Sequence, residues 1–232
     1  MDILFNRMSA VCLLALALTA CGGGGDVASA SPSPLSVDAY GMSTFESTAI
    51  SSSLMALPLE TISNEEQNSL AFMREEEKLA HDVYAQLDTL WSNQTRVFVN
   101  IAKSEATHTE AIRQLLVRYN LTDPSATRVA GQYQSTKLQA LYTQLVAMGT
   151  TSLIEALKVG AAIEEIDMID INTALLGIDN QDIVLVYQNL LKGSRNHLRA
   201  FVSALTNQGV TYVPQYMALA DYQIIISQAI ER

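Results

Sequence analysis

One stretch of the chain, residues 98–119, constrains the fold more than any other. It reads FVNIAKSEATHTEAIRQLLVRY, and its apolar side chains recur at helical spacing, which predicts an amphipathic helix with one face in a core. Glu105 and His108 fall in the middle of that face, because residues three apart share a helix face. A buried carboxylate is costly unless it is paired, and a bound cation would pair with it and with the imidazole. For this helix alone, the alternative is an ordinary core histidine with Glu105 at the edge of the face.

A second amphipathic helix is predicted at residues 64–91. It starts with a capping-box sequence at residues 63–66, in which a serine is followed three residues later by a glutamate. Glu77 lies on its apolar face. Glu76, about 100° away around the helix, remains an alternative, whereas Glu75, about 200° away, is expected to face solvent.

Two further long helices are predicted, at residues 152–170 and 181–208. Shorter helices are expected at residues 136–148 and 170–176. Glu164 and Asp167 share a face of the third long helix, with Glu165 as the rival of Glu164 for the inward position, and a solvated flank is the alternative for these acids. His197 lies on the apolar face of the fourth. Four helices therefore each place a potential metal ligand on an apolar face near mid-length, which favours a metal site over unrelated buried charges.

The sequence predicts a targeting signal at the N-terminus. Residues 1–20 have a short polar start and an apolar run too short to span a membrane permanently. The run ends in Leu18-Thr19-Ala20-Cys21, which resembles the bacterial lipobox, so Cys21 is expected to be lipidated and to become the first mature residue. A secretory signal with a chance cysteine is the alternative. Residues 21–57 are expected to form a flexible tether, with some helix around residues 45–57 as an alternative, and residues 58–232 the folded domain.

This assignment predicts a lipid-anchored protein of the cell envelope. Its membrane partner would be reached through the lipid on Cys21, at the outer membrane or facing the periplasm in a cell with two membranes, and at the surface in a cell with one. The chain has two cysteines, Cys12 and Cys21, so the folded domain offers no sulfur ligand and no disulfide. Any metal must be held by His, Asp or Glu. The net charge of −10 argues against a nucleic-acid partner.

The helical segments resemble known families. Long helices with a crossover between the second and third, inward carboxylates and an E-x-x-H pair resemble the ferritin-like superfamily of di-iron carboxylate proteins. More closely, the segments FMREEEKLAHDVY, NIAKSEATHTEAI, IEEIDMIDI, NLLKGSRNHLRAF and TYVPQY resemble the DUF2202 family, a ferritin-like family of prokaryotes, over residues 65–226. The resemblance implies an all-α fold, a ferritin-like four-helix bundle whose long crossover between helices 2 and 3 contains a short extra helix.

The resemblance also implies a ligand set, which comprises Glu77, Glu105, His108, Glu164 and His197. Glu105 would bridge two metals, with iron, as a di-iron pair, as the implied cofactor and manganese or zinc as alternatives. The usual E-x-x-H pair of the fourth helix is broken, because Ser194 stands three residues before His197. Asp167 is the candidate for the missing carboxylate. Tyr84 is the candidate catalytic residue, as hydrogen-bond partner of a ligand or electron relay, with a packing role as the alternative.

Three hypotheses follow. The first is a di-iron oxidoreductase acting on Fe(II), peroxide or O2, which would need an external electron donor because the chain has no CxxC pair. The second is a metal-binding or sensing protein without turnover, which the Ser194 departure favours. The third is a helical scaffold whose inward acids pair with basic side chains, for which the candidates are Lys103, Arg113, Arg195 and Arg199. Amphipathic helices in tandem would also permit a homodimer. Residues 211–232 are expected to pack over the end of the bundle without chemistry.

Overall fold

The computed structural model of this protein describes residues 33–39 and 41–232, which form a predominantly helical unit. In chain order its elements are β1 (Leu35–Val37), β2 (Ser43–Phe45), α1 (Ser47–Ala56), α2 (Asn64–Trp91), α3 (Val97–Arg118), α4 (Thr136–Gly149), α5 (Leu153–Ala174), α6 (Gln181–Asn207) and α7 (Leu219–Ser227). The predicted signal peptide, Cys21 and residues 22–32 of the predicted tether lie outside the described residues.

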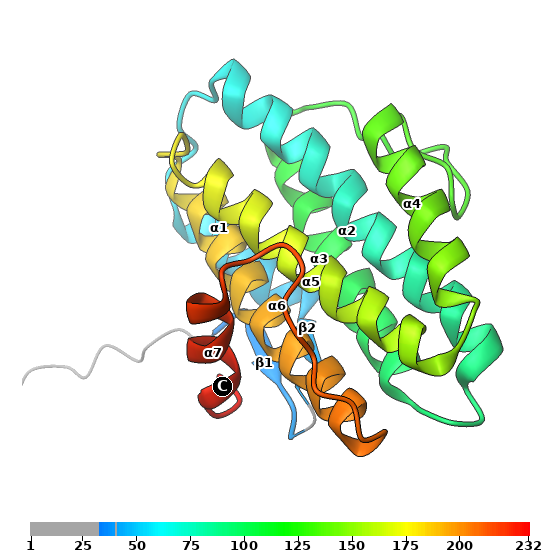
Figure 1. Ribbon diagram of the computed structural model, residues 1–232. Coiled ribbons are helices and arrows are strands. Elements are labelled where there is room, and N and C mark those ends of the chain that lie inside the picture. Colours follow the sequence, from blue (N-terminus) through cyan, green and yellow to red (C-terminus); the bar gives the residue numbers. More distant parts are fainter. Residues whose placement is uncertain (1–32, 40) are drawn as a thin grey trace, which may run out of the picture. The chain divides into compact units, whose positions relative to one another are not determined.

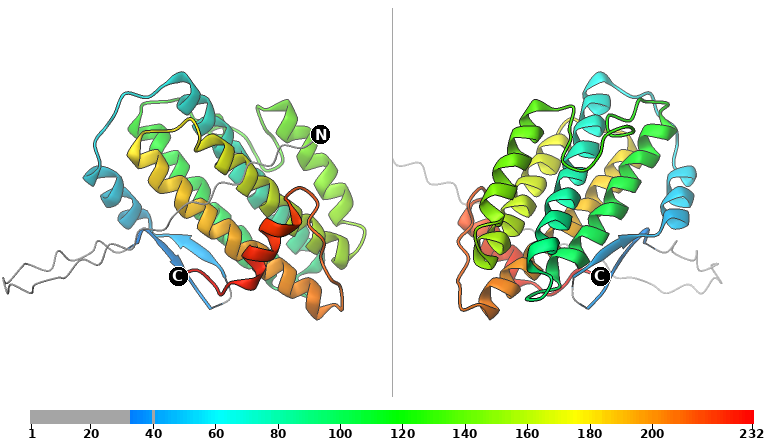
Figure 2. Two further views of the ribbon diagram at one scale, coloured as in Figure 1. Left: turned by 60° about the vertical axis from the view of Figure 1, so that its left-hand side comes forward. Right: turned by 90° about the vertical axis from the view of Figure 1, so that its right-hand side faces the viewer.

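The four long helices α2, α3, α5 and α6 lie side by side (Figures 1 and 2). Helix α2 packs along α3, and α5 packs along α6, while α3 also contacts α6 and α2 also contacts α5. The connection from α3 to α5 contains α4, which packs on the outside of α2 and α5. Each long helix therefore turns one face toward the other three, and the core lies between them.

Local sequence accounts for where the helices begin and end. The Ser63 side chain accepts a hydrogen bond from the backbone of Glu66, and the Glu66 carboxylate accepts one from the backbone of Ser63 at 2.8 Å, so the capping box that starts α2 is confirmed. The separate short helix predicted at residues 170–176 is wrong, since α5 continues to Ala174. The polar residues Asn172 and Thr173 interrupt the apolar pattern, but their side chains bond to carbonyls four residues earlier and leave the helix intact.

The segment before α2 is folded, so the predicted boundary at residue 58 is wrong. Strands β1 and β2 form an antiparallel hairpin with Leu35 opposite Phe45, and β2 contacts α3 and α6. Leu35, Phe45, Ile50 and Leu54 are all buried, and the described residues of this segment belong to the same compact unit as the helices. The tether prediction rested on a Ser-, Gly- and Pro-rich composition. A few apolar side chains suffice here because the helices supply the surface on which they pack.

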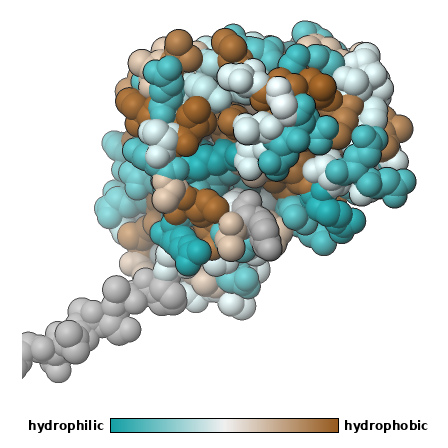
Figure 3. Space-filling view, turned by 60° about the horizontal axis from the view of Figure 1, so that its bottom comes forward, coloured by the Kyte–Doolittle hydropathy of each residue, from teal (hydrophilic) through white to brown (hydrophobic). Residues whose placement is uncertain are grey.

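Large side chains fill the space between the helices, among them Tyr84, Phe98, Tyr187 and Phe201. On the surface, hydrophilic and hydrophobic residues are interspersed over the face shown in Figure 3. Within residues 33–39 and 41–232, none of the helices combines the length and the apolar character that crossing a bilayer requires.

Candidate metal centre

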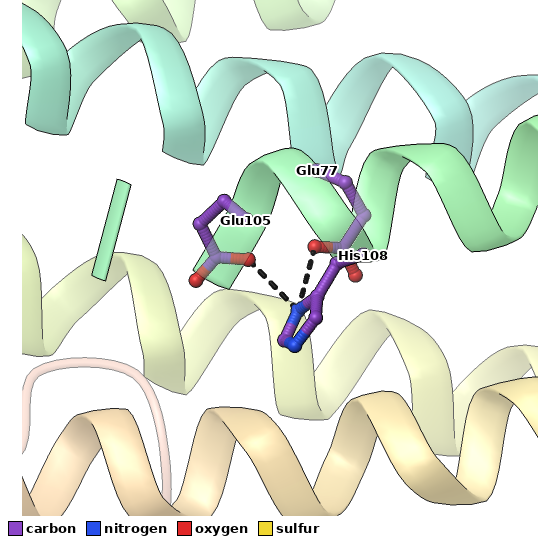
Figure 4. Close-up of side chains that lie close together, drawn as sticks. All are labelled: Glu77, Glu105 and His108. Atoms are coloured by element: carbon purple, nitrogen blue, oxygen red, sulfur yellow. Dashed lines mark ion pairs between the residues drawn. The ribbon is translucent and has the colours of Figure 1, made fainter. Parts of the chain in front are cut away.

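Five ionisable side chains converge in the interior, and we refer to them as the paired centre. They are Glu77 from α2, Glu105 and His108 from α3, Glu164 from α5 and His197 from α6. None of the five is more than 2 % exposed. They form two groups, Glu77–Glu105–His108 (Figure 4) and Glu105–Glu164–His197, and in each the potential ligand atoms lie within 4.8 Å of one another. Glu105 belongs to both groups.

The two oxygens of Glu105 face different imidazoles. His108 Nδ1 lies 2.9 Å from Glu105 Oε2, and His197 Nδ1 lies 2.8 Å from Glu105 Oε1. The outer carboxylates are farther away, with Glu77 Oε2 at 3.4 Å from His108 Nδ1 and Glu164 Oε2 at 3.5 Å from His197 Nδ1. Despite these distances, neither Nδ1 atom has a hydrogen-bond partner among the described residues. The nitrogen and oxygen atoms are therefore close to one another without the alignment of hydrogen bonds, as expected for ligands that point at a shared ion.

The charges of the paired centre are strongly coupled. Burial raises the pKa of Glu77 from 4.5 to about 8. Burial also acts to raise the pKa of Glu105, but His108 and His197 outweigh it and hold that pKa well below its usual range. Burial acts to lower the pKa of His197, and Glu105 followed by Glu164 raises it to about 9. Protons thus occupy the histidines and Glu77 when no cation is bound, and a cation would displace them.

A serine of the N-terminal hairpin contacts the opposite edge of both imidazoles. Ser43 Oγ, on β2, lies 2.8 Å from His108 Nε2, 2.9 Å from His197 Nε2 and 2.7 Å from Ser104 Oγ. One hydroxyl can accept both N–H groups and donate its own proton to Ser104, which in turn donates to the backbone carbonyl of Ser43. This network places each Nδ1 on the side of the carboxylates, where it carries a proton in the metal-free protein and would offer a lone pair once a cation has displaced that proton. Metal-ligating histidines are held by such partners on their second nitrogen.

Helix α6 lies close to His108 and to Ser43 of the hairpin because residue 193 is a glycine. The rings of His108 and His197 are stacked, with centroids 5.3 Å apart and an interplanar angle of 17°. A Cβ atom at Gly193 would lie 2.6 Å from His108 Cε1 and 2.9 Å from Ser43 Oγ. Any larger residue would therefore displace the imidazole or the serine.

Tyr84 is placed to orient one carboxylate of the centre. Its hydroxyl donates to Glu164 Oε1 at 2.6 Å and lies 3.3 Å from the Gly160 carbonyl, and its ring packs against Phe201. The hydroxyl touches the centre through Glu164. Tyr84 is thus a positioning residue in this geometry.

The neighbouring acid Glu165 faces away from the centre, toward the C-terminal segment. Its carboxylate accepts hydrogen bonds from the Tyr212 hydroxyl at 2.6 Å and from the backbone N–H groups of Gln215, Tyr216 and Met217 at 2.9, 2.6 and 2.9 Å. Glu164 rather than Glu165 therefore belongs to the paired centre. The C-terminal segment satisfies a buried charge that helical periodicity alone could not separate from Glu164.

Asp167 lies outside both three-residue groups. The Ser194 hydroxyl, on the adjacent helix α6, is hydrogen-bonded to Asp167 Oδ2, while Oδ1 has no hydrogen-bond partner in the part of the chain that the structure describes. Burial, followed by the charge of Glu77, raises the pKa of Asp167 well above its usual range. Ser194 thus occupies the position at which the ferritin-like pattern has a glutamate, and its hydroxyl binds Asp167 of α5.

The two acids before Glu77 differ from their predicted surroundings. Glu75, expected to face solvent, is buried and accepts backbone hydrogen bonds from Gln134 and Ser135, because the connection between α3 and α4 folds over it. Glu76 is also buried, and within residues 33–39 and 41–232 neither of its oxygens has a hydrogen-bond partner. Burial first, then Asp167 among its neighbours, raises the pKa of Glu76 well above its usual range.

The basic residues proposed as partners for the inward acids lie elsewhere. Arg113 pairs with Glu110, Arg195 and Arg199 pair with Glu231, and Lys103 is exposed. This arrangement removes the support for a scaffold in which those cations neutralise the centre.

Comparisons with known proteins identify the family. The family described as "Uncharacterized protein domain (DUF2202)" matches residues 66–229. Uncharacterized protein MJ0754 of Methanocaldococcus jannaschii is 48% identical over 179 residues, which cover 77% of this chain and 96% of that protein. A crystal structure of hypothetical protein MJ0754 from Methanococcus jannaschii superposes with a TM-score of 0.73 at 47% identity, covering 75% of this chain and 99% of the other. The chain therefore belongs to the DUF2202 family.

Proposed function

We propose that the protein is a metal-binding protein of the cell envelope, in which a ferritin-like four-helix bundle holds a pair of irons. One observation carries this proposal. Two buried carboxylate–histidine groups share Glu105, and each of its oxygens faces a different imidazole. Carboxylate and imidazole ligands suit iron, and also manganese and zinc, which are the alternatives.

The residues of the paired centre fit two ions. Glu77 and His108 would hold one and Glu164 and His197 the other, with Glu105 between them. The fit rests on the buried Nδ1 atoms, which have no hydrogen-bond partner among the described residues although carboxylate oxygens lie close to them. A pair of cations would also offset the cost of burying three carboxylates together.

The chemistry that a bound iron pair supplies is redox, either oxidation of Fe(II) or two-electron reduction of peroxide or O2, with an external donor. The residues of this chain have other roles in that proposal. Ser43 holds both imidazoles with their Nδ1 atoms toward the carboxylates, Tyr84 fixes Glu164, and the burial of all five ligands excludes bulk water. The fold itself does not choose among these reactions.

Metal content tests the proposal. Purified protein is loaded with Fe(II) without oxygen, desalted and analysed by mass spectrometry. We expect about two irons per chain for the wild type, a value set by the two-group geometry, none above background for Glu105→Gln and at most one for Glu164→Gln. Glu155→Gln removes a partly exposed acid of α5 that lies outside the paired centre, and this variant should keep both irons. Wild-type protein with no more iron than the Glu105→Gln variant would contradict the proposal that the paired centre binds metal.

A second candidate function is metal binding or sensing without turnover. The supporting observation is that Ser194 replaces a carboxylate and engages Asp167, so the centre has one acid fewer than the usual ferritin-like pattern. Loaded protein is mixed with O2 or peroxide, and iron oxidation is followed by absorbance. Oxidation faster than that of free Fe(II) favours the oxidoreductase, and stable Fe(II) favours the sensor.

We also propose that a lipid on Cys21 anchors the protein to a membrane outside the cytoplasm. The support is the lipobox-like sequence at residues 18–21 after an apolar run. Labelled palmitate should be incorporated into the wild type and not into Cys21→Ser. Equal labelling of the two would contradict the anchor.

A further inference from the structure

A small internal cavity adjoins the paired centre without belonging to it. It has a volume of about 10 Å³, enough for a single water-sized species, and two acids, Glu76 and Asp167, line it together with apolar side chains of α2, α4 and α5. Glu76 is 4 % exposed and Asp167 7 %. Both oxygens of Glu76 and one of Asp167 are without a hydrogen-bond partner among the residues described.

A surface groove lies directly outside this cavity. The groove has a volume of about 470 Å³ and lies between α4 and α5, with Lys137 and Asp170 at its edge. Leu141 and Ile166 line both the groove and the cavity, so these two side chains form the wall between them. Lys137 Nζ lies 3.5 Å from Asp170 Oδ2 and is itself largely exposed, which leaves the pair open to competition from other ions.

The two acids that line the cavity are close in the chain to ligands of the paired centre. Glu76 precedes Glu77 on α2, and Asp167 follows Glu164 by about one turn of α5. Carboxylates thus succeed one another from Asp170 at the surface, through Glu76 and Asp167, to the paired centre. Within residues 33–39 and 41–232, no ion pair joins Glu76 or Asp167 to a basic side chain.

We propose that Glu76 and Asp167 form a loading site, at which a divalent transition-metal cation from the groove is held by carboxylate oxygens before it moves to the paired centre. The inference rests on the proposed function of that centre. Buried oxygens without partners are costly, and a divalent cation that displaces the protons of these acids would satisfy the hard oxygen donors that they offer. The volume of the cavity admits one ion stripped of most of its water. Movement of the half-buried Leu141 would open the wall.

The rate of metal loading tests the site. Full-length protein is mixed with Co(II) in a stopped-flow instrument, and the ligand-field absorbance of the bound cobalt reports its arrival at the centre. Glu76→Gln keeps the size of the side chain, and we expect it to slow loading about tenfold or more while the final cobalt content stays at the wild-type value. Glu155→Gln changes a partly exposed acid of α5 that is paired with Lys158, and it should load at the wild-type rate.

A second variant acts in the opposite direction. Leu141→Ala thins the wall between groove and cavity, so it should speed loading severalfold without changing the final cobalt content. Loading of both variants at the wild-type rate overturns the loading site while leaving the paired centre intact. A lower final cobalt content in Glu76→Gln also overturns it, because Glu76 would then be a resident ligand. Wild-type protein that binds no cobalt at all overturns the paired centre together with the site that feeds it.

Discussion

A single hydroxyl group joins the N-terminal hairpin to both histidines of the paired centre. Ser43 Oγ is within 2.9 Å of each Nε2 atom, and the ring of Phe45, also on β2, packs edge-on against His108. An imidazole whose Nε2–H is held by an acceptor has a defined tautomer and ring orientation. Ser43 therefore influences both halves of the centre at once.

We expect Ser43→Ala to weaken metal binding by about 10- to 100-fold, the usual effect of removing an outer partner of a ligating histidine. Competition with a chelator of known affinity measures the loss. A shift of the Co(II) absorbance bands would separate reorientation of the imidazoles from simple loosening of the hairpin. Ser36→Ala, an exposed serine on β1, is the matched control. Equal affinity of the two variants would remove Ser43 from the centre.

Sequence periodicity placed Glu77, Glu105, His108, Glu164 and His197 on apolar helix faces, and the structure brings those five side chains together. Periodicity could not decide which of two adjacent acids is buried. Glu75 and Glu165 are as buried as their neighbours, because backbone N–H groups from distant segments bind their carboxylates. Those partners come from irregular connections, and no repeating spacing in the sequence relates them to the helices.

At the scale of elements, the four long helices and the short α4 could be predicted because each has its own amphipathic pattern, and α2, α4 and α5 also begin with a capping serine. The hairpin could not, and for α1 the sequence offers a helix only as an alternative to a tether. Their few buried side chains, such as Leu35 and Ile50, are separated by small polar residues and pack on surfaces provided by α3 and its neighbours. An element whose stability comes from contacts distant in the chain leaves little local signal.

Three segments outside the long helices supply hydrogen-bond partners to buried polar side chains. The α3–α4 connection covers Glu75 with the backbone of residues 134–135, the C-terminal segment covers Glu165 with that of residues 215–217, and the hairpin covers the two histidines. Each therefore satisfies polar groups that the helices alone leave buried. These contacts stabilise the fold, because a buried carboxylate or imidazole without a hydrogen-bond partner costs free energy.

For the whole molecule, the buried acids and histidines make stability depend on pH. The pKa of Glu77 is raised from 4.5 to about 8 and that of His197 from 6.5 to about 9. For both groups the folded state binds the proton more tightly than the unfolded state. Their contribution is fully present below about pH 4.5 for Glu77 and about pH 6.5 for His197, and it is lost as the pH rises through the folded values.

We therefore expect metal-free protein to become less stable between about pH 5 and pH 9, as urea unfolding would measure. Stabilisation by bound metal should change in the opposite direction, because at higher pH the ion displaces fewer protons. Metal-free protein whose unfolding midpoint rises over this range would contradict the protonation pattern. Loaded and metal-free samples from one preparation provide the comparison.

The position of Ser43 has a consequence for how such a centre diverges. The family match begins at residue 66, so the hairpin that holds both histidines precedes it, while every acid and imidazole of the centre lies within it. The hairpin and the matched residues 66–229 can change independently in sequence, yet both contact the rings of His108 and His197. Substitutions in the hairpin alone would change metal affinity while every ligand stays the same. Natural variation in the hairpin can therefore act on the centre.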